Sequence, residues 1–284
     1  MASTTASVAP DRVGSRRGRV RGYLAAGSVI VLGLVLSGCN GDFFATPGVT
    51  KQSHEEFRLW HGMMVTGFIV AIFVWLLIFW SIIRYRKKRG DETMPKQTHE
   101  HIGLEVTYTV IPLLMVLVIF YFTVVVENQV DNTLAPPAVI VNVTGYQWGW
   151  RFEYSKPDGG VVVQTAPNAA PSALAQNYFD TKLYPQLVLP EGETVRFFLR
   201  SNDVIHGFYV HDFNFSRYVQ PGVVNQFEIE PTTLGYFKGQ CTQYCGLYHS
   251  EMLFSVHVVS ATQFTQWIGK QAKLQNSSNS RSTS

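Results

Sequence analysis

Charged residues and cysteines are both scarce in this sequence. Asp, Glu, Lys and Arg make up 15% of its 284 residues, against roughly 25% in ordinary soluble domains. Three cysteines are too few for a small domain held together by disulfides. A net charge of only +3, with no basic face beside a recognition motif, argues against a nucleic-acid-binding protein. Because aromatic residues reach 13%, a disordered chain is excluded as well. The composition predicts a membrane protein with a folded soluble part.

Residues 1–38 are typical of a bacterial signal peptide. Several arginines precede an apolar run over residues 23–36, which has the length of a signal-peptide core and is short for a membrane-spanning helix. The sequence Leu-Ser-Gly-Cys at residues 36–39 follows the lipobox pattern of bacterial lipoproteins. We therefore expect Cys39 to begin the mature chain and to carry a diacylglyceryl group, whose two acyl chains anchor firmly. The alternative is a cysteine that follows an uncleaved first helix.

Two uncharged apolar runs, Gly62 to Ile83 and Val106 to Val126, predict a transmembrane helical hairpin over residues 62–126. Each run has the roughly 20 residues needed to cross the hydrocarbon core. Residues 84–105, which connect the runs, contain six Lys and Arg, whereas residues 39–61 contain two. The positive-inside rule places the connecting loop in the cytoplasm and the rest of the chain outside the cell membrane.

Residues 136–262 have the pattern of a β domain. Short β-branched and aromatic runs alternate with polar residues and turn signals. Six or more strands over about 125 residues predict a β-sandwich or Greek-key barrel. Residues 263–284 form the C-terminal tail, for which we predict a short helix over 266–273 followed by a disordered, Ser- and Asn-rich end.

Four residues near the end of this domain have the spacing of metal ligands: Cys241, Cys245, His249 and Met252. Two thiolates, an imidazole and a thioether form a soft ligand set that selects copper over magnesium or calcium. His206, directly after an earlier predicted strand, is a fifth candidate. The two cysteines could instead form a disulfide in an oxidising compartment, but the histidine and methionine that follow favour copper.

The presence of two cysteines also indicates how many copper ions are bound. A mononuclear blue-copper site uses a single cysteine, so two thiolates suit a pair of copper ions that share the sulfur atoms. One electron spread over two metal ions changes each bond length little. These ligands leave no coordination position open for a substrate, so we predict that the site transfers electrons.

The run Cys-x3-Cys-x3-His-x2-Met after a two-helix hairpin resembles subunit II of haem–copper cytochrome c oxidases, in a bacterial lipoprotein form. The resemblance covers residues 59–259 and implies a membrane α plus all-β fold: a two-helix hairpin followed by a cupredoxin-like Greek-key β-sandwich with a dinuclear copper centre, CuA. It implies a subunit that accepts electrons from cytochrome c, or from a tethered haem c domain. The electrons pass to haem in subunit I, where oxygen is reduced, and subunit III is a further partner.

The resemblance also implies the copper ligands. They are His206, Cys241, Gln243 through its backbone carbonyl, Cys245, His249 and Met252. The family usually has glutamate at the position of Gln243, where the side chain helps to hold magnesium at the interface with subunit I. A neutral amide is a weaker ligand for a hard cation, which weakens the case for magnesium in this chain.

Two further residues match functional positions of the family. Trp148 matches the tryptophan at which electrons from cytochrome c enter, although Gly149 replaces the usual aromatic residue beside it. Trp150 shares a strand face with Trp148 and is expected to pack in the core. Glu105, at the cytoplasmic end of the second span, matches a glutamate near the mouth of a proton pathway into subunit I. Its alternative role is a charge that marks the end of a helix.

Three other protein classes compete with this interpretation. Quinol-oxidase subunits II have the same fold but lack the copper ligands. Nitrous oxide reductases carry the same copper centre but add a propeller domain that 284 residues cannot hold. A copper-binding membrane lipoprotein of the metallochaperone kind would need an accessible, labile site and has no evident use for the hairpin.

Overall fold

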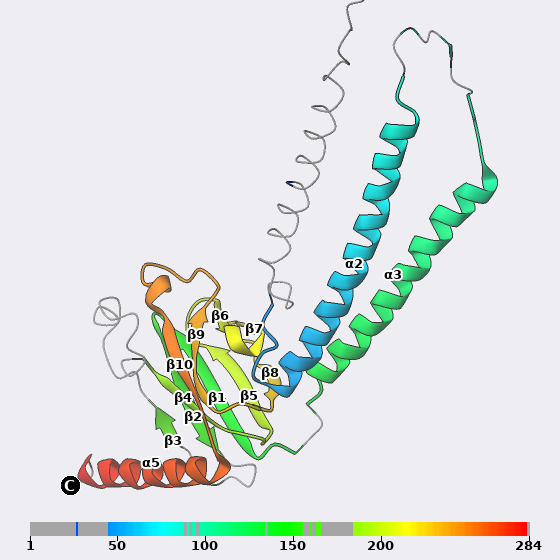
Figure 1. The fold of residues 1–284 in the computed structure, drawn as a ribbon. Coiled ribbons are helices and arrows are strands. Elements are labelled where there is room, and N and C mark those ends of the chain that lie inside the picture. Colours follow the sequence, from blue (N-terminus) through cyan, green and yellow to red (C-terminus); the bar gives the residue numbers. More distant parts are fainter. Residues whose placement is uncertain are drawn as a thin grey trace, which may run out of the picture. The chain divides into compact units, whose positions relative to one another are not determined.

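The computed structural model describes only part of the chain. The described residues are 27, 45–87, 90, 93–94, 97–133, 136–155, 160, 163–165 and 184–282. Apart from Gly27, the predicted signal peptide lies outside them, as does Cys39, so both stay predictions. The described chain consists of two long helices, two β-sheets and a C-terminal helix (Figure 1).

Helix α2 extends over Lys51–Arg84 and so begins well before the predicted apolar run. Its start is fixed by a capping box, in which the Ser53 N–H donates to Thr50 Oγ1 at 3.0 Å and the Thr50 N–H donates to Ser53 Oγ at 3.0 Å. Gly48 precedes the cap with φ of 76°, and a Cβ there would lie 2.2 Å from Ser53 Oγ. Much of the predicted N-terminal segment 39–61 is therefore helical.

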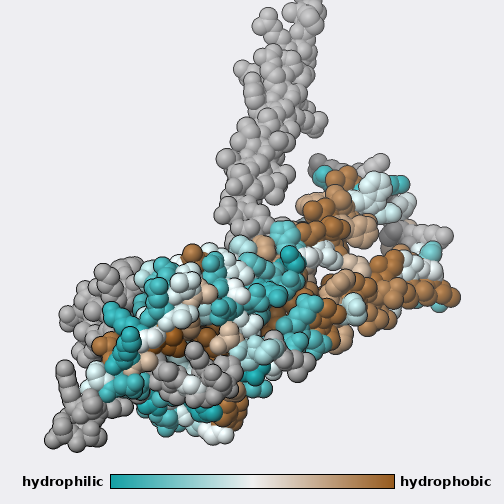
Figure 2. All heavy atoms as spheres, turned by 90° about the horizontal axis from the view of Figure 1, so that it is seen from below, coloured by the Kyte–Doolittle hydropathy of each residue, from teal (hydrophilic) through white to brown (hydrophobic). Residues whose placement is uncertain are grey.

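Helix α3 covers Ile102–Val130 and contains Pro112. Both α2 and α3 are long and apolar enough to cross a membrane, and hydrophobic residues dominate their surface in Figure 2. The connection is shorter than the predicted loop 84–105, because α3 begins at Ile102 with His101 as its N-cap. Glu105 thus lies in the first turn of the helix rather than in a loop.

The β domain consists of two five-stranded sheets (Figure 1). The first has the order β3-β2-β1-β5-β8, with β1 at Val139–Tyr146, β2 at Gly149–Ser155, β3 at Val163–Thr165, β5 at Val195–Ser201 and β8 at Asn225–Ile229. The second has the order β4-β10-β9-β6-β7, with β4 at Gln186–Pro190, β6 at His206–Val210, β7 at Phe215–Val219, β9 at Gly235–Cys241 and β10 at Leu253–Val259. Strands β1 and β5 pair in parallel, as do β4 and β10.

The hydrophobic core lies between the two sheets. Phe208 on β6 faces Phe197 and Phe227 of the opposite sheet, with ring centroids 6.2 and 5.9 Å apart. Trp150 is fully buried and contacts Phe254 edge to face at 5.4 Å, so its predicted packing role is confirmed. The predicted fold class, a two-helix hairpin followed by a β-sandwich, is also confirmed.

The C-terminal residues differ from the prediction. Instead of a short helix and a disordered tail, one helix, α5, extends over Ala261–Ser282. Phe264 and Ile268 are buried against the sandwich, and Trp267 meets Tyr154 edge to face at 5.1 Å. These apolar positions repeat at helical spacing and give α5 a face that packs on the β domain.

Candidate metal centre

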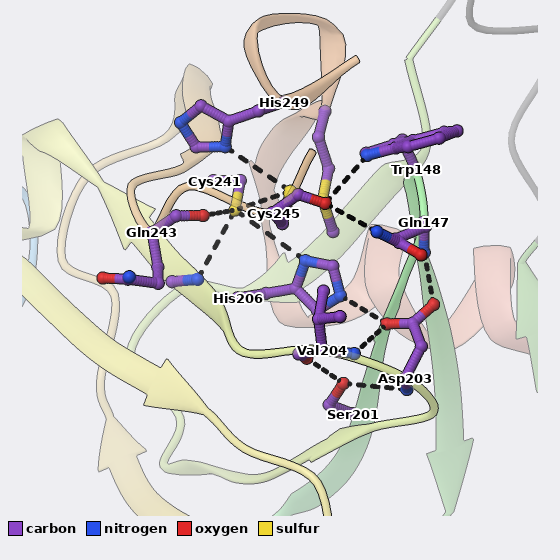
Figure 3. A network of polar contacts seen from close by, with 12 residues as sticks. Gln147, Trp148, Ser201, Asp203, Val204, His206, Cys241, Gln243, Cys245 and His249 are labelled. Atoms are coloured by element: carbon purple, nitrogen blue, oxygen red, sulfur yellow. Dashed lines mark hydrogen bonds and ion pairs between the residues drawn. The ribbon is translucent and has the colours of Figure 1, made fainter. Parts of the chain in front are cut away.

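The predicted ligands come from three parts of the second sheet. His206 is the first residue of β6, and Cys241 is the last residue of β9, which pairs with β6. The loop after β9 turns through a short 3-10 helix, η3, at His249–Glu251 and returns to β10 just after Met252. The Cys241 N–H donates to the Met252 carbonyl at 3.0 Å. This bond closes the loop, and the ligand side chains converge inside it (Figure 3).

The two cysteines are buried and face each other. Their sulfur atoms lie 3.9 Å apart, too far for a disulfide, whose bond length is about 2.05 Å. Together with His206 they form a group whose donor atoms all lie within 4.8 Å of one another. The disulfide alternative therefore does not fit this structure.

The remaining donors surround the two sulfur atoms. Cys245 Sγ lies 3.5 Å from His249 Nδ1 and 3.8 Å from Met252 Sδ. Cys241 Sγ lies 4.0 Å from His206 Nδ1 and 3.2 Å from the Gln243 carbonyl oxygen. Ligands about 2.3 Å from a tetrahedral ion lie about 3.8 Å from each other, so the donors have the separations of atoms that share a metal.

This donor set fits a pair of soft metal ions. Each of the two central sulfur atoms lies near an imidazole nitrogen and one further donor. For Cys245 the further donor is a thioether, and for Cys241 it is a carbonyl oxygen. Six donors are more than one four-coordinate ion requires, and thiolate with thioether favours copper. The residues present therefore fit copper, and their number would suffice for two ions.

The orientation of His206 is set by a carboxylate. Its Nε2 lies 2.8 Å from Asp203 Oδ1, which leaves Nδ1 facing Cys241. Histidines that bind metals usually donate their other ring N–H to a carboxylate, a backbone carbonyl or water. Burial alone would lower the pKa of His206, but the contacts with Cys241 and Asp203 raise it above its ordinary value. Asp203 shows the matching shift: burial would raise its pKa, but hydrogen bonds from the Gln147 N–H and from His206 lower it.

The two thiols differ in acidity. Burial and the negative field of Cys241 raise the pKa of Cys245 to about 12. Burial would also raise the pKa of Cys241, but hydrogen bonds from His206 and from the Gly207 N–H lower it below its ordinary value. Cys241 is therefore the readier thiolate, and a metal ion bound at Cys245 would take the place of that thiol's proton.

Comparison with known proteins assigns the chain to a family. Residues 40–126 match the model of the cytochrome c oxidase subunit II transmembrane domain. Residues 139–259 match the model of the cytochrome c oxidase subunit II periplasmic domain. The chain belongs to the cytochrome c oxidase subunit II family. Its β domain is accordingly of the cupredoxin-like type that the sequence predicts, and the family works as part of an oxidase complex.

Two relatives identified by sequence agree with this assignment. A probable cytochrome c oxidase subunit 2 of Nocardia farcinica is 34% identical over 93% of this chain and 86% of its own length. A probable cytochrome c oxidase subunit 2 of Streptomyces avermitilis is 36% identical over 86% of each chain. Among solved structures, the periplasmic domain of subunit II from Bradyrhizobium japonicum covers 50% of this chain and 99% of its own, at 26% identity and a TM-score of 0.42.

In this subunit II chain, Trp148 lies beside the ligand loop. Its indole N–H donates to the Cys245 carbonyl at 3.1 Å, and its ring meets Tyr248 edge to face at 5.0 Å. Two neighbours that the sequence analysis missed, Gln147 and Asp203, complete this part of the site (Figure 3). The positions of Gln147, directly before the tryptophan, and of Asp203, three residues before His206, were the available signals.

Glu105 is not part of this cluster. It lies on α3, where its Oε1 accepts a hydrogen bond from the His101 N–H at 3.0 Å. The His101 imidazole in turn accepts from the Leu104 N–H at 3.1 Å. These bonds cap the start of the helix, so the structure gives Glu105 the alternative role, that of a charge at the end of a helix.

Proposed function

We propose that this chain accepts electrons from cytochrome c at a dinuclear copper centre, CuA, and passes them to haem in subunit I of a respiratory oxidase. Oxygen reduction takes place in that partner chain. The carrying observation is the convergence of four further donors, two imidazoles, a thioether and a backbone carbonyl, on two cysteine sulfur atoms in a chain of the subunit II family. The metallochaperone alternative is not favoured, because His206, Cys241, Cys245 and Met252 are all buried.

The contacts of the ligand side chains within the protein would hold them in position before the metal binds. When bound, the copper pair would supply a group that takes up and releases one electron. Cys241 and Cys245 would bind both ions, and burial of the thiolates and of Met252 keeps water away from them. His206 is already turned toward Cys241 by Asp203. Such a rigid set suits electron transfer, since little has to move.

Gln243 would contribute only its backbone. Its carbonyl oxygen lies close to Cys241 Sγ, whereas its side chain is a neutral amide. Replacement of the family's glutamate leaves the backbone donor unchanged but removes a carboxylate that a magnesium ion would prefer. We therefore propose copper without magnesium binding through this side chain.

Trp148 offers a route from the surface to the copper ligands. The indole N–H bonds to the backbone of Cys245, while the ring meets Tyr248, which is exposed at the surface of the same loop. We propose that electrons from cytochrome c, or from a tethered haem c domain, enter at this tryptophan.

The membrane arrangement follows from the hairpin. Helices α2 and α3 would cross the bacterial cell membrane beside subunits I and III, with the basic connection in the cytoplasm and the β domain outside. Lipidation at Cys39 would add a second anchor on the outer side. Mass spectrometry of the mature N-terminus should find acyl chains on Cys39, whereas an intact Met1 terminus would exclude this processing.

Rapid mixing of the purified oxidase complex with reduced cytochrome c tests the proposed order of events. We expect the near-infrared absorption of the copper centre to bleach first and the haem of subunit I to be reduced afterwards, because the donor reaches haem only through this subunit. Reduction of haem at the full rate in a complex freed of this copper would contradict the proposal.

Replacing Glu105 with glutamine tests its proposed place at the mouth of a proton pathway. Glutamine keeps an oxygen that can accept from the His101 N–H, so the helix cap survives and only the ionisable group is lost. We expect turnover to fall at least about tenfold, while reduction of the copper centre keeps its rate. Glu127→Gln, at the opposite end of α3, is the matched control. Unchanged turnover in Glu105→Gln would leave this residue with its capping role alone.

A further inference from the structure

We propose that Gln147 is a positioning residue that holds the indole of Trp148 against the ligand loop, with Asp203 as its anchor, and so sets the rate of electron uptake. The inference rests on the proposed function, because it concerns the route by which electrons reach the copper ligands. It assigns a role to a residue outside the donor set.

Asp203 anchors the turn that carries Gln147. The Asp203 carboxylate accepts from the Gln147 N–H through Oδ2 at 2.7 Å and from the Val204 N–H through Oδ1 at 2.7 Å. The same Oδ1 lies 2.8 Å from His206 Nε2. One carboxylate thus connects two segments (Figure 3). The first is the turn between β1 and β2, which contains Gln147. The second is the start of β6, where His206 is a proposed copper ligand.

Gln147 and Trp148 both contact the ligand loop. The side-chain amide of Gln147 donates to the Cys245 carbonyl at 2.7 Å, and the indole N–H of Trp148 donates to the same oxygen at 3.1 Å. A carbonyl oxygen has two lone pairs and can therefore accept both of these hydrogen bonds. The next residue, Gly246, lies so close that a Cβ would come within 3.2 Å of both side chains. The tryptophan and the loop are therefore held together by one shared acceptor.

These contacts indicate what Gln147 does. The Gln147 side chain is exposed, so it adds little to the core. Instead, the backbone N–H of Gln147 bonds to Asp203 and its side-chain amide bonds to Cys245. Without its amide, the Cys245 carbonyl keeps a single donor, and the indole can shift relative to the loop. Electron transfer depends on distance and orientation, and displacements of about 1 Å at a reacting group cost rate steeply.

Two substitutions of Gln147 in the assembled oxidase complex test the proposal. Gln147→Leu removes the amide at similar volume, and Gln147→Glu keeps the shape but presents acceptors in place of the donor. We expect both to slow reduction of the copper centre by cytochrome c about tenfold, with copper content, reduction potential and the electron spin resonance spectrum unchanged. Gln226→Leu, at an exposed glutamine on β8, is the control and should keep the parent rate.

Three results would overturn the inference. Parent-like rates in both variants would show that Gln147 does not matter for electron uptake. A parent-like rate in Gln147→Glu alone would show that the donated hydrogen bond is not the cause. Loss of copper together with rate would show that Gln147 merely supports the fold of the site. Failure of the proposed function looks different, because the unaltered complex would then show no reduction of a copper centre by cytochrome c.

Discussion

Replacing Cys245 with serine is expected to strip copper from the oxidase and to lower turnover with reduced cytochrome c by at least about a hundredfold, since even outer-shell changes at metal sites cost up to about that factor. The Cys245 sulfur lies at the centre of the donor set, 3.9 Å from Cys241 Sγ, 3.8 Å from Met252 Sδ and 3.5 Å from His249 Nδ1. A serine hydroxyl is a hard, neutral donor in place of a bridging thiolate, so neither copper ion would keep its ligand set.

Copper analysis of the purified complex and oxygen uptake measure this effect. Tyr244→Phe is the matched control, because Tyr244 is the exposed neighbour of Cys245 in the same loop and its ring contact with His249 survives in phenylalanine. We expect this control to retain copper. Full copper content in Cys245→Ser would mean that the sulfur is not a ligand.

Replacing Arg196 with methionine is expected to destabilise the β domain by about 3–5 kcal/mol, the usual cost of breaking one partner of a buried ion pair. Arg196 Nε donates to Glu228 Oε1 at 2.7 Å, and its Nη2 donates to the Thr133 carbonyl at 2.5 Å. The Glu228 side chain is only 3% exposed. Without the guanidinium, a buried carboxylate loses its cation, and the linker between α3 and β1 loses a hydrogen bond to the sheet.

Two further variants separate the ion pair from other effects. Arg200→Met changes an exposed arginine on the same strand, bonded to Asn142, and should cost less than about 1 kcal/mol. The double variant Arg196→Met/Glu228→Leu removes both charges and should recover much of the loss. Chemical unfolding of the full chain in detergent, followed by tryptophan fluorescence, measures all three. Equal losses in the single and double variants would refute the ion-pair explanation.

The order of helices and strands along the chain could be predicted, because each is indicated by a short stretch of sequence. Uncharged apolar runs indicate the hairpin, and alternating residues indicate strands over residues 136–262. The start of α2 was missed because residues 51–61 are partly polar, so hydropathy alone places the boundary too late. A capping signal was present in Thr50 and Ser53. The length of α5 was missed because its Ser- and Asn-rich end has the composition of a disordered tail, although the helix continues to Ser282.

In the candidate site, the metal donors could be predicted from the sequence, but their hydrogen-bonding neighbours were not. Most of its donors occur within one short loop, so their spacing alone was informative. Gln147 was not predicted, because its partners lie far away along the chain, whereas Asp203 lies only three residues before His206 and could have been found from that spacing. Gln147 is 98 residues from Cys245 and 56 residues from Asp203. Only the pairing of β1 with β5 and of β6 with β9 brings these segments together.

The most direct test of the dinuclear copper assignment is electron spin resonance of the purified, copper-loaded oxidase together with its copper content. An unpaired electron shared equally by two copper nuclei splits into more hyperfine lines, with smaller spacing, than an electron held by one nucleus. We expect the shared pattern and two copper ions bound at Cys241 and Cys245. A single-nucleus spectrum, or a disulfide between these cysteines in the active complex, would contradict the assignment.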